Sequence, residues 1–100
     1  MRVIGQIAHP SLKISVFRND NRLSVKFENT HYETTFKMGD DDRFRTVADV
    51  EQFVDAAFLQ EIQGIFQQMH AARLGAMARQ FPVVSEQEFE EIIWKYPFND

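Results

Sequence analysis

Hydrophobic and polar side chains alternate along three segments in the first 40 residues. Residues 12–18, 23–28 and 32–38 each carry an apolar side chain at nearly every second position. A period of two predicts β-strands with one buried face and one polar face. A fourth apolar run, residues 3–8, ends just before Pro10, because proline has no N–H to donate to a strand ladder.

Short polar segments separate these strands. Asn19-Asp20-Asn21 tolerates left-handed backbone and favours a tight hairpin, and Asn29-Thr30 is a second turn signal. Period-two segments joined by such turns predict a four-stranded antiparallel meander. Only the apolar face of this sheet needs a cover.

Residues 46–81 change to a helical period and predict a long amphipathic helix, or two helices nearly end to end. Thr46, followed three residues later by an aspartate, resembles a capping box. A continuous helix of about 50 Å would exceed a small sheet of ~17–20 Å. We therefore expect a break near Val54-Asp55 or at Gly64, or a half that extends beyond the sheet. The predicted apolar face consists of Val47, Val50, Val54, Ala57, Phe58, Ile62, Ile65, Phe66, Met69, Ala72 and Ala76.

The C-terminal segment, residues 82–100, predicts a short amphipathic helix after a linker. Pro82 ends the preceding helix, and Ser85 with Glu88 forms a capping box. Aromatic and branched apolar residues of the kind that anchor interfaces follow. The helix either packs on its own sheet or long helix, or docks on a second copy or another protein. The candidate protein-interaction residues are Phe89, Ile92, Ile93, Trp94, Tyr96 and Phe98.

These patterns together predict an α+β protein with a single domain. It has a four-stranded antiparallel β-meander and a long, possibly broken, helix in residues 1–81, and a linker with a short C-terminal helix in residues 82–100. One face of the sheet is covered by the long helix. The predicted core residues are Val25, Phe27, Phe36, Val50, Val54, Phe58 and Ile62.

Charge is unevenly distributed along the chain. The net charge is −4, with +2 over residues 1–45 and −6 over residues 46–100. An acidic chain is a poor candidate for sequence-independent nucleic-acid binding, which requires neutralisation of phosphates. There is no cysteine, no basic N-terminal segment followed by a long apolar run, and no apolar run of membrane-spanning length. We therefore expect a cytoplasmic protein with no disulfides and no membrane partner.

The open face of the sheet offers an alternative function, nucleic-acid binding. Basic and aromatic residues on a four-stranded sheet are typical of RNA-recognition modules. Here Phe17 is the single ring on that face, and Glu28 and Glu33 oppose the lysines, which favours a solvated face. The residues of this alternative are Lys13, Phe17, Lys26 and Lys37.

Metal and catalytic patterns do not emerge from the sequence. His9, His31 and His70 lack the spacing of metal ligands. The contiguous aspartates 40–42 do not match a calcium loop, and there is no glycine-rich phosphate loop or nucleophile elbow. We predict no catalytic residue, no metal and no cofactor, and keep a small enzyme as a second alternative.

The opening residues Val3-Ile4-Gly5 and Ile7, with His9-Pro10 and Lys13-Ile14, resemble the start of a family of small bacterial proteins of unknown function. The resemblance implies no known activity and assigns no functional residue. From the residues themselves we predict a non-catalytic protein-interaction or assembly module, whose partner is a second copy, as in a homodimer, or another protein.

Overall fold

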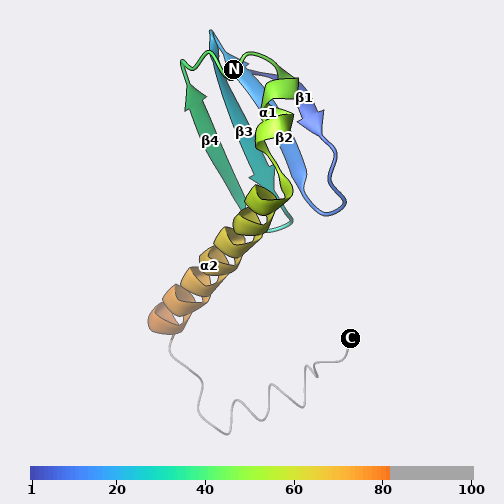
Figure 1. Cartoon of the computed structure of the whole chain (residues 1–100). Coiled ribbons are helices and arrows are strands. Elements are labelled where there is room, and N and C mark those ends of the chain that lie inside the picture. The colour runs from blue at the N-terminus through green and yellow to red at the C-terminus, as the bar shows by residue number, and fades with distance from the viewer. Residues whose placement is uncertain (82–100) are drawn as a thin grey trace, which may run out of the picture. The chain divides into compact units, whose positions relative to one another are not determined.

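The computed structural model describes residues 1–81 and places four strands before two helices in that part of the chain (Figure 1). The predicted C-terminal helix lies outside the described residues. The strands are β1 (Arg2–Ile7), β2 (Lys13–Asn19), β3 (Arg22–Glu28) and β4 (Glu33–Gly39), and the helices are α1 (Val47–Phe53) and α2 (Ala56–Gln80).

The sheet is an antiparallel meander in the order β1-β2-β3-β4, as predicted. Val16 pairs with Val25, and Val25 pairs with Phe36, so one apolar row crosses three strands. The β2–β3 hairpin turns through Asp20, whose φ of 56° lies in the left-handed region. The polar residues between β2 and β3 therefore form the tight hairpin turn that the sequence predicts.

Gly5 allows α1 to approach β1 closely. A Cβ atom at Gly5 would lie 2.8 Å from Cγ2 of Val47, the first residue of α1. The register of β1 against β2 also shifts between Val3 and Gly5. Glycine is required here because the space beneath α1 is too small for a Cβ atom.

The core lies between the apolar face of the sheet and the helical residues that cover it. Five of the seven predicted core residues are buried, whereas Phe36 and Phe58 are partly buried and pack against the core. Ile65, which the periodicity places on the apolar face of the helix, is 37% exposed. The buried hydrophobic residues are Leu12, Ile14, Val16, Leu23, Val25, Phe27, Val50, Val54, Ile62 and Phe66.

Phenylalanine rings beside the core form an edge-to-face chain. The ring of Phe58 lies 5.6 Å from that of Phe27, 5.2 Å from that of Phe36 and 5.2 Å from that of Phe53. Phe44 continues the chain, with its ring 5.1 Å from that of Phe53. Each such pair adds about 0.5–1.5 kcal/mol beyond area burial.

The helical segment breaks at Val54-Asp55, one of the two predicted positions. The predicted capping box at the start of α1 is present, because Thr46 Oγ1 accepts from the N–H of Asp49 and the Asp49 carboxylate accepts from the N–H of Thr46. After the break, the Asp55 carboxylate accepts from the N–H of Phe58 at 2.8 Å and caps α2. The other candidate position, Gly64, lies within α2 and does not interrupt it.

The chain divides into two compact units. Met1–Met69 form the first, and the second begins at His70. All of the buried hydrophobic residues within 1–81 belong to the first unit. None of the helices in the described part of the chain is long and apolar enough to cross a membrane.

Candidate functional site

The open face of the sheet brings together the residues of the nucleic-acid alternative. Phe17 and Lys37 are both partners of Ser24 across the strands, and Lys13 pairs with Glu28. Strand alternation therefore places Lys13, Phe17, Lys26 and Lys37 on the same face.

Lys26 at the centre of this face is largely neutralised by its neighbours. Its Nζ lies 3.5 Å from a Glu28 carboxylate oxygen, 3.9 Å from one of Glu33 and 5.3 Å from the centre of the Phe17 ring. A phosphate at this position would have to compete with two carboxylates. Lys13 and Lys37 remain exposed, which is a small basic surface for nucleic acid.

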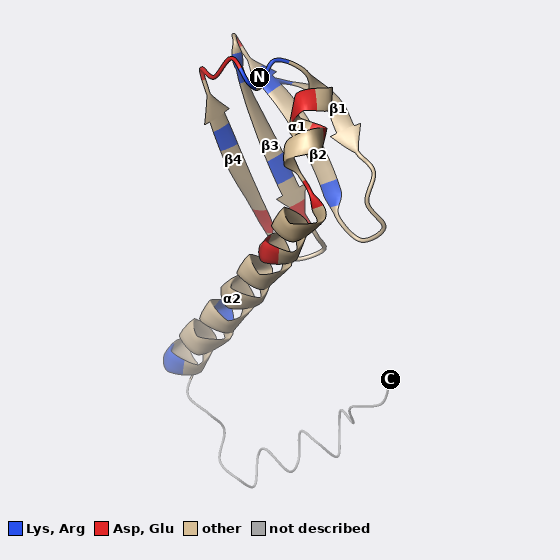
Figure 2. Cartoon of the chain, viewed as in Figure 1, with Lys and Arg blue, Asp and Glu red and all other residues tan. Residues whose placement is uncertain are grey.

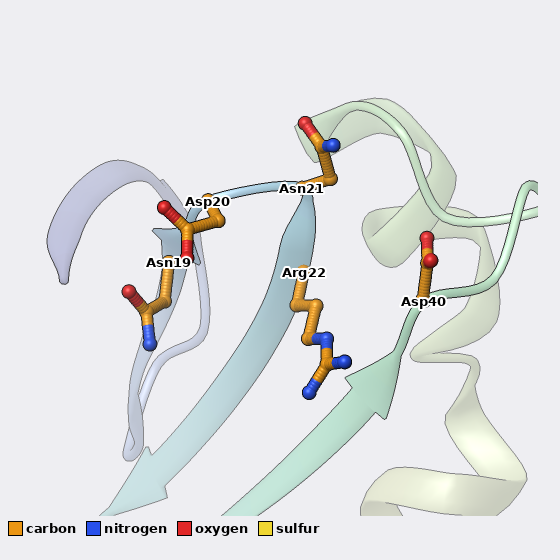
Figure 3. A pocket seen from close by; sticks show the side chains of 5 residues that line it. All are labelled: Asn19, Asp20, Asn21, Arg22 and Asp40. Carbon is orange, nitrogen blue, oxygen red and sulfur yellow. The ribbon is translucent and has the colours of Figure 1, made fainter.

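A polar hollow of about 400 Å³ lies at the β2–β3 hairpin (Figure 3). The sequence analysis did not anticipate it, because it joins the hairpin to the end of β4. Figure 3 shows that its side chains do not point toward one common centre. A smaller hollow of about 200 Å³ shares Asn19 and Arg22. The larger hollow is lined by Asn19, Asp20, Asn21, Arg22 and Asp40.

The acidic loop before α1 is organised by its own arginines. Arg43 Nη2 lies 2.7 Å from Asp41 Oδ2, and Arg45 pairs with Asp42. Hydrogen bonds from the side chain and backbone of Arg43 lower the pKa of Asp41 to about 2. Arg18 Nη2 also donates to the Arg45 carbonyl at 3.0 Å and ties this loop to β2. These interactions give the loop a structural role.

The described histidines do not form a metal site. His9 Nδ1 accepts hydrogen bonds from the backbone N–H groups of Ser11 at 3.1 Å and Leu12 at 3.0 Å, and so closes the β1–β2 turn. Within residues 1–81, no group of three His, Asp or Glu side chains is placed to hold a metal ion.

Three large apolar side chains at the C-terminal end of α2, the last of them one residue beyond the helix, are exposed to solvent. Leu74 is 56% exposed, Met77 48% and Phe81 68%. Steps of three and four residues place them within about 60° of one another around the helix. The N–H of Phe81 donates to the Met77 carbonyl at 2.8 Å, so the helical hydrogen bonding reaches Phe81. We call these three residues the α2 row.

The C-terminal part of α2 carries only basic charges. Beyond Glu61, α2 contains Arg73 and Arg79 and no acidic residue. Figure 2 shows the red segment near the start of α2 and blue segments toward its C-terminal end. Around the helix, Arg73 lies about 40° from Met77 and flanks the row, whereas Arg79 lies on the opposite side of α2. Sequence periodicity could have identified the row, but the apolar stripe through Ile62 and Met69 dominated the pattern.

No protein-family model, curated protein or solved structure matches this chain. The resemblance of its opening residues to small bacterial proteins stays a prediction. The predicted protein-interaction residues, from Phe89 to Phe98, lie outside the described residues.

Proposed function

We propose that this chain is a non-catalytic protein-interaction module that binds a partner through the α2 row. The supporting observation is the exposure of Leu74, Met77 and Phe81 on one helical face. Large apolar side chains grouped on a surface are typical of protein-binding sites. The partner is a protein that presents an acidic amphipathic helix, because the row needs apolar anchors and Arg73 lies beside it on the helix.

An apolar helix face commonly binds a second helix through residues spaced by three and four positions. The row has this spacing. Apolar contacts would supply the affinity, and Arg73 would favour an acidic partner over a basic one. The function needs no catalytic residue, metal or cofactor.

Site-directed capture from a native cell lysate tests the proposal. A photo-reactive residue at Met77 of the full-length chain should cross-link a partner, and Leu74→Asp should abolish the product by placing a charge in the interface. Ala72 is also exposed and lies on the opposite side of α2. There are two matched controls. One has the photo-reactive residue at Ala72, and the other has the photo-reactive residue at Met77 together with Ala72→Asp. Equal cross-linking from positions 72 and 77, or insensitivity to Leu74→Asp, would contradict the proposal.

Nucleic-acid binding through the open face is the alternative function. Its support is the common face of Lys13, Phe17, Lys26 and Lys37, and its weakness is the pairing of Lys26 with Glu28 and Glu33. Salt-sensitive binding of a single-stranded RNA that is lost in Lys37→Glu would favour it. Absence of binding at low salt would exclude it.

A further inference from the structure

We infer that the free edge of β4 pairs antiparallel with β4 of a second copy, about a two-fold axis that passes through Thr35. The pairing would join two four-stranded sheets into one continuous sheet. The interface lies on the strands and is separate from the α2 row, so the inference does not rest on the proposed function. The backbone direction, the register and the charges of residues 33–37 support it.

β4 has a strand neighbour on one side only. The sheet has the order β1-β2-β3-β4, so β3 pairs with one edge of β4 and no strand within residues 1–81 pairs with the other. Figure 1 shows β4 at this outer edge of the sheet. The other outer strand, β1, is less suited to pairing, because its register shifts between Val3 and Gly5 and a bulge disrupts an edge. β4 keeps a regular register from Glu33 to Lys37.

Backbone groups of three β4 residues point toward the free edge. The N–H of Asn29 donates to the Tyr32 carbonyl at 2.9 Å, so the pair that closes the β3–β4 hairpin is hydrogen-bonded. Antiparallel ladders alternate between hydrogen-bonded and non-hydrogen-bonded pairs. Every second β4 residue after Tyr32 is therefore in a non-hydrogen-bonded pair with β3, and its N–H and C=O face away from β3. These residues are Glu33, Thr35 and Lys37.

Charge favours one register between two such edges. Glu33 and Lys37 lie two residues on either side of Thr35 and on the same face of the sheet. When Thr35 lies opposite Thr35 of the second copy, Glu33 of each copy lies opposite Lys37 of the other. A register centred on Glu33 or on Lys37 would instead place like charges opposite each other, which is destabilising.

Both charged side chains are available to a second copy. The Glu33 side chain is 64% exposed, and Lys26 Nζ lies closer to Glu28, at 3.5 Å, than to Glu33, at 3.9 Å. Lys37 is exposed and forms no ion pair with any residue of the described part of the chain. Lysine on an edge strand commonly prevents edge pairing. In this register, however, it meets a carboxylate of the other copy.

Self-complementarity favours a second copy over an unrelated strand. A two-fold interface uses the same patch on both subunits and closes at the dimer. Residues 33–37 fit this symmetry, because threonine is at their centre and opposite charges are at their ends. On the covered face, Thr34 of one copy would lie opposite Phe36 of the other, and a β-branched residue opposite an aromatic one stabilises a strand pair.

Complementary charge variants of the full-length chain test the pairing. Glu33→Lys and Lys37→Glu each place like charges opposite each other in a homodimer, whereas a mixture of the two variants restores both opposite-charge pairs. Sedimentation velocity would measure the monomer–dimer equilibrium over roughly 1 μM to 1 mM. Lys13→Glu is the matched control, because it makes the same charge change on the same face in β2. Circular dichroism would verify that each variant is folded.

The natural chain and Lys13→Glu should dimerise, and each interface variant should dimerise at least about tenfold more weakly. The mixture should recover the affinity of the natural chain. Monomers at every concentration would overturn the inference and leave the β4 edge to a strand of another protein. A dimer that is insensitive to both variants, or a mixture that shows no recovery, would overturn the predicted pairing in favour of another face.

The register has a separate test, because the chain has no cysteine of its own. Thr35→Cys would place two thiols opposite each other at a Cα separation of about 5.5 Å, which a disulfide can span. Lys13→Cys, exposed on the same face, is the matched control, because its two copies would lie five strand spacings apart, about 24 Å. Mild oxidation should give a disulfide-linked dimer of Thr35→Cys in several-fold higher yield than of the control. Equal yields would overturn the register centred on Thr35.

Discussion

Gly5 has a steric role that its sequence position alone does not indicate. Its missing side chain leaves room for Val47, whose branched Cγ atoms would lie 2.8 and 3.0 Å from an added Cβ. A β-branched side chain is stiff at χ1 and cannot easily turn away. Because β1 carries this residue beneath the first turn of α1, any larger side chain must displace α1 or distort β1.

Replacement of Gly5 by alanine should lower the free energy of unfolding by about 1–3 kcal/mol through overpacking. Urea denaturation followed by circular dichroism would measure the change. A Gly5→Ala variant as stable as the natural chain would show that Val47 moves aside at little cost.

Asp41 should contribute to acid sensitivity. Its pKa is lowered from 3.8 to about 2 in the folded chain by hydrogen bonds from Arg43. A carboxylate with a lowered folded-state pKa stabilises the fold above its unfolded pKa, and the contribution disappears as pH falls through the folded value. Because the pair lies at the surface and the Arg43 side chain is 83% exposed, the effect is small.

The measurement is the urea midpoint against pH for the natural chain and Asp41→Asn. The difference between the two should be present above pH 3.8 and shrink as pH falls toward about 2. A difference that does not change over this interval would contradict an ionic origin.

At the scale of secondary-structure elements, α2 contains a glycine that its packing does not need. An added Cβ at Gly64 would have no neighbouring atom within 4 Å, and the helix continues through this position. Glycine within a helix costs about 0.8–1.0 kcal/mol relative to alanine.

Gly64→Ala should therefore raise the free energy of unfolding by up to about 1 kcal/mol. The effect is opposite in sign to that of Gly5→Ala, so the pair compares the same substitution in open and crowded surroundings. Urea denaturation of both variants checks it. Destabilisation by Gly64→Ala would mean that the described helix face has a neighbour at this position.

The strands were predictable from sequence because their period of two is a local property. Their ends differ by at most one residue from the prediction, since cross-strand pairing decides where a ladder stops. For example, the run 3–8 forms β1 as Arg2–Ile7. The sequence predicted a helix break at one of two positions, Val54-Asp55 or Gly64. The structure has it at Val54-Asp55, where the Asp55 carboxylate caps α2.

The candidate sites were less predictable. Strand parity places the four residues of the open face together, but the approach of Lys26 to Glu33 depends on the register between β3 and β4. The hollow at the β2–β3 hairpin combines Arg22 with Asp40, which are distant in sequence. Exposure of Leu74 and Met77 depends on where the core ends, which periodicity does not define.

At the scale of the whole molecule, the first unit contains the complete described core. The buried hydrophobic residues run from Leu12 to Phe66, within Met1–Met69. A fragment of residues 1–69 should therefore unfold cooperatively in urea, although a domain of this size is only marginally stable. A gradual unfolding transition without a folded-state baseline would show that residues beyond 69 are required for the core.

The meander topology also determines the order in which the chain can fold. Every strand pairs with its sequence neighbour, so the loops to be closed are short and their entropic cost is low. During synthesis, the hairpins can form in succession from the N-terminus. Val16, Val25 and Phe36 then line an uncovered face until Ile62 and Phe66 have left the ribosome. The nascent sheet is consequently the stage at which this chain is most exposed to aggregation.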